Sequence, residues 1–173
     1  DITSDDTFLA GVYYSQGDAF TGMQDWKSAL KSYLKSYELE SDGSYAAKAL
    51  KASYQTALMP LNENNFELAI IQFDSLINII PSGPLLTAAH YSKGDAFSEL
   101  EEWKAAGKSY LESFKLEPDG KYAAKALMNV GISLGKMQKI NEACNILNRV
   151  EARFPRNQIV EEAQYEMQIL GCS

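Results

Sequence analysis

Residues of types that can perform catalysis occur throughout this 173-residue chain, but none of them stands in a recognisable catalytic motif. The single histidine, His90, has no serine or cysteine partner in such a motif. Asp95 and Glu99 share a helix face, but carboxylates at this spacing are usually solvated. The Gly-Asp dipeptides at 17–18 and 94–95 fall inside predicted helices and not in a phosphate-binding loop. No His/Cys/Asp cluster has metal-ligand spacing, so the sequence predicts no catalytic residue, no cofactor and no metal site.

The charge and hydropathy of the chain narrow the choice of partner. A formal net charge of -7 argues against a nucleic-acid backbone or an anionic membrane as the main partner. A basic surface on a partner protein suits the chain better, although ordinary solubility also explains this acidity. No apolar run approaches the roughly 18 residues that span a bilayer, so we expect no membrane insertion. Residues 1–6 are polar and acidic, and we expect no signal peptide in the sequence given.

The most informative feature is a stretch of sequence that occurs twice in the chain. Residues 14–50 recur at 91–127, and 24 of the 37 aligned positions are identical by direct count. Self-similarity at a period in the 30s is typical of a helical solenoid. Stacked helix pairs of this kind present surfaces that hold other proteins, so the repeat favours a protein-binding role.

Small and large residues recur at fixed distances and define the repeat. After an anchor glycine, a large apolar residue follows at three, nine and sixteen positions, and an alanine at twelve. A weaker copy keeps this register with Ala57 in place of the glycine. The pattern resembles the tetratricopeptide repeat (TPR), in which small residues sit where two helices cross closely and aromatic residues fill the space beside them. The anchors are Gly17, Phe20, Trp26, Ala29, Tyr33; Ala57, Phe66, Ala69, Phe73; Gly94, Phe97, Trp103, Ala106, Tyr110; and Gly131, Leu134, Ile140, Ala143, Leu147.

These anchors predict an all-α fold with a single TPR domain over residues 1–173. The domain is a TPR superhelix, an α–α solenoid of four helix pairs plus a C-terminal capping helix. The alanine anchors are spaced 40, 37 and 37 residues apart, which indicates an extra near-turn in the helix that starts around Ser44. Pro60 falls late in that helix, where it should end or kink it. The predicted repeats cover approximately 10–43, 50–83, 87–120 and 124–157, with the cap at 158–172.

A stripe along the first helix of each pair is the candidate partner-binding groove. The residue three before each anchor usually faces the inner groove of such a superhelix, and the residue one after it continues the same face. Tyrosine and methionine with acidic neighbours suit the capture of a helix or extended peptide that bears basic residues. Packing of the tyrosines against neighbouring helix pairs is an equally good interpretation. The stripe consists of Tyr14, Asp18, Tyr54, Leu58, Tyr91, Asp95, Met128 and Ile132.

The two cysteines could tie the predicted cap to the solenoid. Cys144 lies on the second helix of the fourth pair, and Cys172 ends the capping helix. A bond between them encloses 29 residues, and loop-closure entropy then predicts roughly 3 to 4 kcal/mol of stabilisation. Such a bond requires an oxidising compartment. Two unrelated thiols, one of them buried, are the alternative.

From Tyr54 to Cys172 the sequence resembles a known family. One group of matching residues comprises 65–70 with Phe73, 123–127 with 130–131, and 134–136. The more specific motif is Glu142-Ala143-Cys144, followed by Leu147, Val150, Arg153-Phe154-Pro155 and Leu170-Gly171-Cys172. These residues are similar to the C-terminal domain of the Tol-Pal system TPR proteins, also called cell division coordinator CpoB or YbgF.

The resemblance implies a non-enzymatic adaptor in the periplasm. It would bind TolA or a cell-wall synthesis component and link outer-membrane constriction to septal peptidoglycan synthesis. The family usually begins with a trimerising coiled coil, whereas residues 1–53 here supply an additional repeat, so the oligomeric state stays open. A generic TPR scaffold for another envelope assembly or secretion partner is the alternative function.

Overall fold

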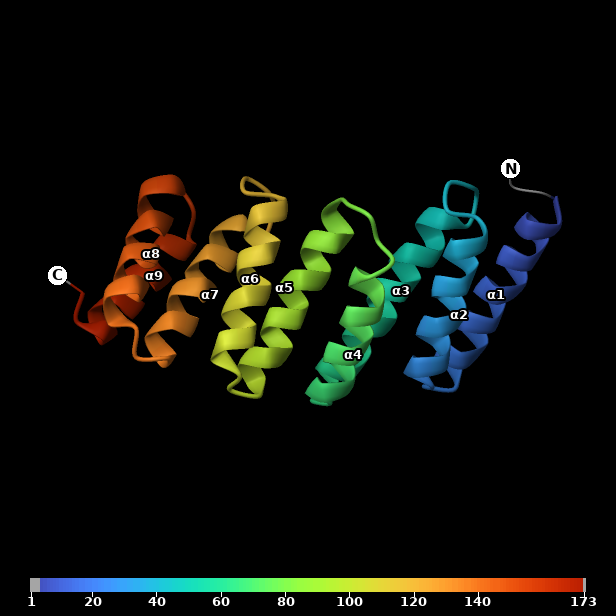
Figure 1. Cartoon of the computed structure of the whole chain (residues 1–173), viewed down its shortest axis with the longest axis horizontal. Coiled ribbons are helices and arrows are strands. Elements are labelled where there is room, and N and C mark those ends of the chain that lie inside the picture. The colour runs from blue at the N-terminus through green and yellow to red at the C-terminus, as the bar shows by residue number, and fades with distance from the viewer. Residues whose placement is uncertain (1–3, 173) are drawn as a thin grey trace. The chain divides into compact units, whose positions relative to one another are not determined.

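The computed structural model describes residues 4–172, and over that range it consists of nine α-helices with no strand (Figure 1). The helices fall into two compact units, residues up to Pro81 (unit 1) and residues from Ser82 onward (unit 2). Unit 1 contains α1 (Ser4–Gly22), α2 (Trp26–Leu39), α3 (Ala46–Asn62) and α4 (Phe66–Ile77). Unit 2 contains α5 (Pro84–Glu99), α6 (Trp103–Leu116), α7 (Ala123–Lys136), α8 (Ile140–Arg153) and α9 (Ile159–Leu170).

The predicted all-α fold of four helix pairs and a capping helix is confirmed over the described residues. The extra near-turn of the second copy is also present, since α3 has 17 residues and α7 has 14. Pro60 lies inside α3, which continues through it and ends two residues later at Asn62. That residues 1–173 form one domain stays a prediction, and its ends, 1–3 and 173, lie outside the described residues.

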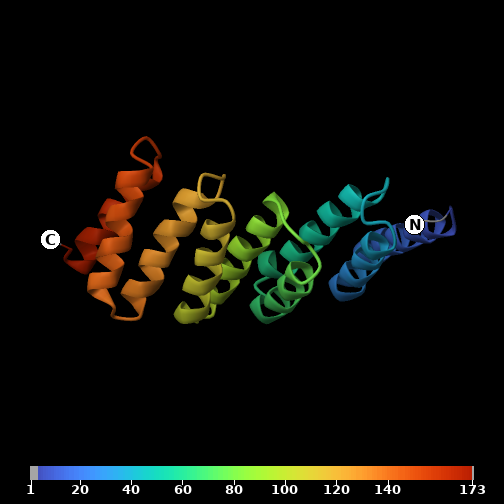
Figure 2. The same cartoon turned by 45° about the horizontal axis from the view of Figure 1, so that its top comes forward.

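Each helix pair crosses at the small residues that the repeat pattern marks, and in both views of unit 1 α1 and α2 run side by side (Figures 1 and 2). The anchor alanines Ala29, Ala69, Ala106 and Ala143 are fully buried. A Cβ atom added at Gly94 would lie 2.7 Å from the Tyr110 ring, closer than real Cβ contacts come. Glycine is therefore required here because the facing aromatic ring occupies the space that a side chain would need.

The aromatic anchors Trp26, Tyr33, Phe73 and Tyr110 lie in the core, as predicted. Phe73 is fully buried, while Tyr33 and Tyr110 are each 3% exposed. Trp26 is also buried, and its indole Nε1 donates a hydrogen bond to the Glu63 carboxylate beyond the end of α3. The anchors Phe66 and Trp103 are only half-buried.

The first helix of every pair ends in the same turn. A residue in the left-handed conformation follows the helix, and the next amide N–H donates to the carbonyl five residues back. This is the Schellman motif, whose left-handed position is most often glycine. In the four pairs that position is instead Gln24, Asn64, Glu101 and Gln138. Helix α9 ends in the same motif, with Gly171 as the left-handed residue and Cys172 N–H donating to the Met167 carbonyl.

Helix α9 covers the fourth pair, as expected of a terminal cap. Its Ile159 and Ala163 side chains are buried with Leu127, Leu147 and Val150 in the core of unit 2. In both views α9 lies beside α8 (Figures 1 and 2). None of the described helices is long and apolar enough to cross a membrane.

Candidate partner-binding site

The predicted stripe residues of α5 belong to an aromatic cluster in unit 2. The Tyr91 ring stacks on Tyr122 with centroids 4.9 Å apart and contacts Tyr110 at 5.4 Å. The Asn129 side-chain amide donates to the Tyr91 hydroxyl, and the Tyr110 hydroxyl donates to Asp95 Oδ1 at 2.8 Å. Only 6% of Tyr91 is exposed. For Tyr91 the structure therefore shows the packing alternative, with little of the ring left for a ligand.

The matching cluster of unit 1 contains the same residue types in a more open setting. Tyr14 contacts Tyr33 at 5.4 Å and Tyr45 at 5.8 Å between ring centroids. The Tyr33 hydroxyl donates to Asp18 Oδ1 at 2.7 Å. Tyr14 is only half-buried, and Asp18 is exposed to solvent. The stripe residues of α1 therefore keep a surface that a partner can reach.

The two clusters differ in burial because different residues come after them in the sequence. The positions that Met128 and Asn129 occupy on α7 are Lys51 and Ala52 on α3 when the duplicated blocks are extended. Met128 is 4% exposed, and Asn129 binds the Tyr91 hydroxyl directly. The aromatic cluster of unit 2 is therefore tightly buried where α7 supplies the long side chains of Met128 and Asn129.

Burial changes the acid–base properties of the unit 2 cluster. Desolvation raises the pKa of Asp95 to about 6, although the Tyr110 hydrogen bond and the nearby Lys125 charge both favour the carboxylate. The same desolvation raises the pKa of Tyr91 and of Tyr110 well above the ordinary range. In unit 1, burial raises the pKa of Tyr33 to about 12. These phenols stay protonated at physiological pH and act as hydrogen-bond donors.

The stripe residues of α3 are partly exposed. The Tyr54 ring lies 6.3 Å from Phe73 of α4, and Leu58 one turn further along α3 is half-buried. Both side chains therefore contribute to the packing of unit 1 while keeping some accessible surface.

The stripe residues of α7 lie in a hollow that α9 completes. Met128 and Ile132 form its apolar part, in a volume of about 340 Å³. The other lining residues come from one face of α9 and were not predicted: Glu161, Glu162, Tyr165 and Glu166. Tyr165 is 63% exposed. These four residues lie at i, i+1, i+4 and i+5 on α9, beside the apolar positions Ile159 and Ala163, and this spacing is the sequence signal that could have identified them.

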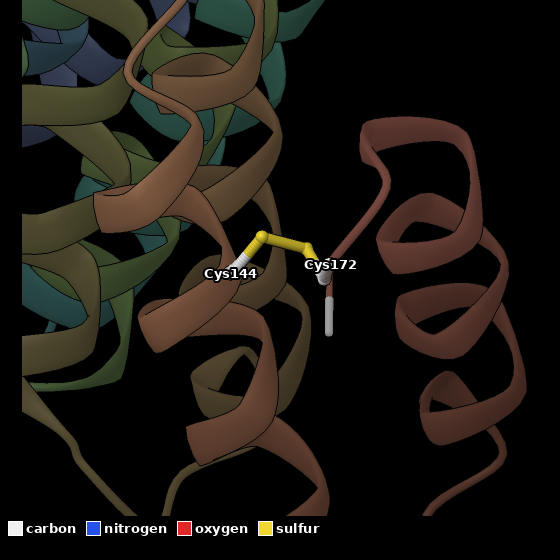
Figure 3. Close-up of a disulfide and its surroundings, with 2 residues drawn as sticks. All are labelled: Cys144 and Cys172. Atoms are coloured by element: carbon white, nitrogen blue, oxygen red, sulfur yellow. A yellow bond between two sulfur atoms is a disulfide. The ribbon is translucent and has the colours of Figure 1, made fainter.

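A disulfide joins Cys144 of α8 to Cys172, with 5.5 Å between the two Cα atoms. Figure 3 shows the Cys144 side chain pointing from α8 toward Cys172. The bond ties the end of α9 to the fourth helix pair, which is the arrangement that the sequence favoured.

Between residues 4 and 172, no group of three His, Cys, Asp or Glu side chains gathers closely enough to hold a metal ion. His90 lies on α5 and is half-buried, between buried residues on either side of it in the sequence.

Comparison with known families matches one part of the chain. Residues 125–157 match the family model described as Tetratricopeptide repeat. This segment coincides with the predicted fourth repeat and with α7 and α8. Comparison with curated proteins gives no match.

Solved structures share the fold along nearly the whole chain. The apo form of RapI superposes with a TM-score of 0.65 and 16% identity over 97% of this chain, which spans 48% of RapI. YrrB, described as a TPR protein with an unusual peptide-binding site, gives a TM-score of 0.61 and 18% identity over 91% of this chain and 74% of its own. MamA from Desulfovibrio magneticus RS-1 gives 0.58 and 13% identity over 99% of this chain and 92% of its own.

The class of protein is clear from these observations: the chain is an all-α solenoid of helix pairs. One repeat, residues 125–157, is similar to the tetratricopeptide repeat, and the fold along the chain is shared with the TPR protein YrrB. Solenoids of stacked helical repeats present extended surfaces that bind other proteins.

Proposed function

We propose that the chain is an interaction adaptor that binds a basic and partly apolar segment of a partner protein. The observation that carries the proposal is the hollow between α7 and α9. The half-buried Ile132 and the exposed Tyr165 offer apolar surface there beside the nearly buried Met128, and three glutamates surround it. A lysine or arginine side chain suits such a hollow, because its aliphatic stem packs on the apolar residues while its charge reaches the carboxylates.

The stripe residues of α1 in unit 1 offer a second surface for a basic side chain. Asp18 presents a carboxylate beside the half-buried Tyr14 ring. An aromatic face next to a carboxylate is a good contact for a basic side chain, through both cation–π and ionic attraction. Partner segments with several basic residues therefore suit the surfaces of both units.

A binding titration with charge-reversed variants tests the proposal. A labelled peptide of alternating lysine and leucine is titrated against the whole chain. Glu162→Lys is expected to weaken binding by about tenfold, the equivalent of one lost charge pair of roughly 1.4 kcal/mol. Glu67→Lys is the matched control, because Glu67 is also in the first turn of a helix and the change in net charge is the same. Equal effects of the two variants would leave the hollow without a role.

We further propose that the adaptor works in the periplasm as a Tol-Pal type protein that binds TolA or a cell-wall synthesis component. The Glu142-Ala143-Cys144 motif and the terminal Gly171-Cys172 support this proposal by resemblance. The Cys144–Cys172 disulfide also supports it, because disulfides persist in oxidising compartments such as the bacterial periplasm.

Affinity capture from an envelope extract tests this assignment. Recovery of a Tol-Pal or septal cell-wall component, and its loss with Glu162→Lys, is the expected result. Recovery of an outer-membrane assembly or secretion protein instead would favour the alternative of a generic TPR scaffold for another envelope partner.

A further inference from the structure

A second cleft lies in unit 1, between α2 and α4, and has a volume of about 730 Å³. Its apolar lining includes the buried Leu30 and Leu34 of α2 and the exposed Ile71 of α4. The α1 residues that line it are Tyr13, Gln16 and Phe20. At 100° per residue, these lie on a different side of α1 from Tyr14 and Asp18. The cleft is therefore separate from the surface proposed above for a basic segment.

The charge of this cleft is opposite to that of the chain as a whole. Lys27, Lys31 and Lys35 line it at intervals of four residues along α2, and Glu38 is the one acidic side chain among its lining residues. Glu38 bridges Lys35 at 3.2 Å. The row therefore leaves a net positive edge beside an apolar cleft, on a chain whose net charge is -7.

The cleft also contains a buried amide with no hydrogen-bond partner. Gln72 of α4 lines the cleft and is 2% exposed, and its Nε2 and Oε1 atoms have no partner among the described protein atoms. Buried polar groups are rarely left unpaired, and such a group calls for an explanation. The fold does not require glutamine here, because the equivalent positions of the other repeats are Ser32, Ser109 and Ile146.

From these features we propose that the α2–α4 cleft of unit 1 binds an extended acidic peptide segment of a partner protein. The Gln72 side chain turns into the cleft and pairs with the peptide backbone, since an amide donates and accepts as a peptide bond does. A helical ligand does not meet this requirement, because its backbone groups are already paired. Lysines four residues apart on a helix are about 6 Å apart along the axis, and alternate side chains of an extended peptide are about 6.7 Å apart. Acidic residues at alternate positions therefore match the lysine row, and apolar residues match the leucines.

Fluorescence anisotropy with three capped octapeptides tests the proposal on the whole chain. The first peptide alternates glutamate and leucine, the second has glutamine in place of glutamate, and the third is the first with N-methylated backbone amides. The first peptide is expected to bind at least about tenfold more tightly than the other two, which lack either the charge or the backbone donors.

Two variants locate the binding. Lys31→Glu is expected to weaken binding of the first peptide by about tenfold, whereas Lys108→Glu, the equivalent position of α6, leaves it unchanged. Gln72→Met is expected to raise the melting temperature and also to weaken peptide binding by about tenfold. The rise in melting temperature shows that a loss of binding is not a loss of folding.

Each opposite outcome overturns the proposal. No binding of the first peptide at millimolar concentration, or equal binding of the glutamine peptide, excludes an acidic ligand. Unchanged affinity in Gln72→Met means that the amide binds buried water only. Because the ligand charge and the unit both differ from those of the α7–α9 hollow, failure here leaves the proposed adaptor function intact.

Discussion

Replacing Asp95 by asparagine is expected to stabilise the protein at neutral pH and to have little effect near pH 4. The Asp95 carboxylate is partly buried on α5 and has a pKa of about 6, with desolvation as the main cause. The charges and dipoles around it are the Tyr110 hydroxyl of α6, Lys125 of α7 and Glu99 of α5 itself. Asparagine removes the charge and retains an oxygen that can accept the Tyr110 hydrogen bond.

The magnitude can be worked out from the difference between the folded and unfolded pKa. A rise from 3.8 to about 6 is about 2.2 pKa units, and at 1.36 kcal/mol per unit it gives about 3 kcal/mol as an upper bound. Between pH 4 and pH 6 the folded state holds a proton that the unfolded state has already released. The stability contributed by the protonated form is therefore complete below pH 4 and is lost as the pH rises through 6. Loss of the Lys125 attraction and the new amide N–H groups reduce the gain, so we expect about 1 to 3 kcal/mol at pH 7.5.

Urea unfolding followed by circular dichroism, at pH 7.5 and pH 4, measures the effect. Asp18→Asn is the matched control, because Asp18 accepts the same tyrosine hydrogen bond in unit 1 but is exposed. Its effect on the free energy of unfolding is expected to stay within about 0.5 kcal/mol. A destabilised Asp95→Asn variant at pH 7.5, or an equal gain at both pH values, would refute the argument from desolvation.

Three further perturbations give separate checks on the fold. Cys172→Ser is expected to lower the free energy of unfolding by about 3 kcal/mol if loop-closure entropy dominates, and hydrogen exchange should show the loss first in α9. Gly94→Ala is expected to cost about 1 to 3 kcal/mol, since its Cβ would meet the Tyr110 ring at 2.7 Å; Gly22→Ala, with open space around it, should instead be neutral or stabilising in the same thermal melt. Glu101 has a left-handed backbone with φ of 58°, and Glu101→Gly should relieve its strain and raise the free energy of unfolding by about 0.5 kcal/mol. An unchanged or lower melting temperature would show that this turn carries no strain.

The helix pairs could be predicted from the sequence because their contacts are encoded by pairs of residue types at fixed spacing. Gly94 facing Tyr110 and Ala106 at the crossing leave little freedom in how the two helices meet. The candidate groove was harder to predict because its exposure depends on the next helix pair along the chain as well as on its own. Tyr14 and Tyr91 stand in nearly identical blocks, yet only Tyr91 is buried.

The cleft of unit 1 could not be predicted from periodicity for a related reason. Gln72 occupies a core position by helical spacing, and spacing alone does not say whether its amide finds a partner. Three-dimensional packing decides that, because the groups around a buried side chain come from several helices. Comparison of Gln72 with Ser32, Ser109 and Ile146 is the signal that could have drawn attention to it.

The disulfide adds a covalent link between the turn that follows α9 and helix α8. In each of the four pairs, the residue after the left-handed position is the N-cap residue of the second helix. That second helix then packs along the first helix of its pair. Cys172 occupies the same position in the turn after α9, and a covalent bond to α8 takes the place of that helix cap. The disulfide fixes the C-terminal end of α9, whereas residues 154–158 connect its N-terminal end to α8 and Ile159 and Ala163 pack there. In the oxidised protein both ends of α9 are therefore covalently tied to α8, and reduction would leave only the 154–158 connection and the packing of Ile159 and Ala163 to hold it.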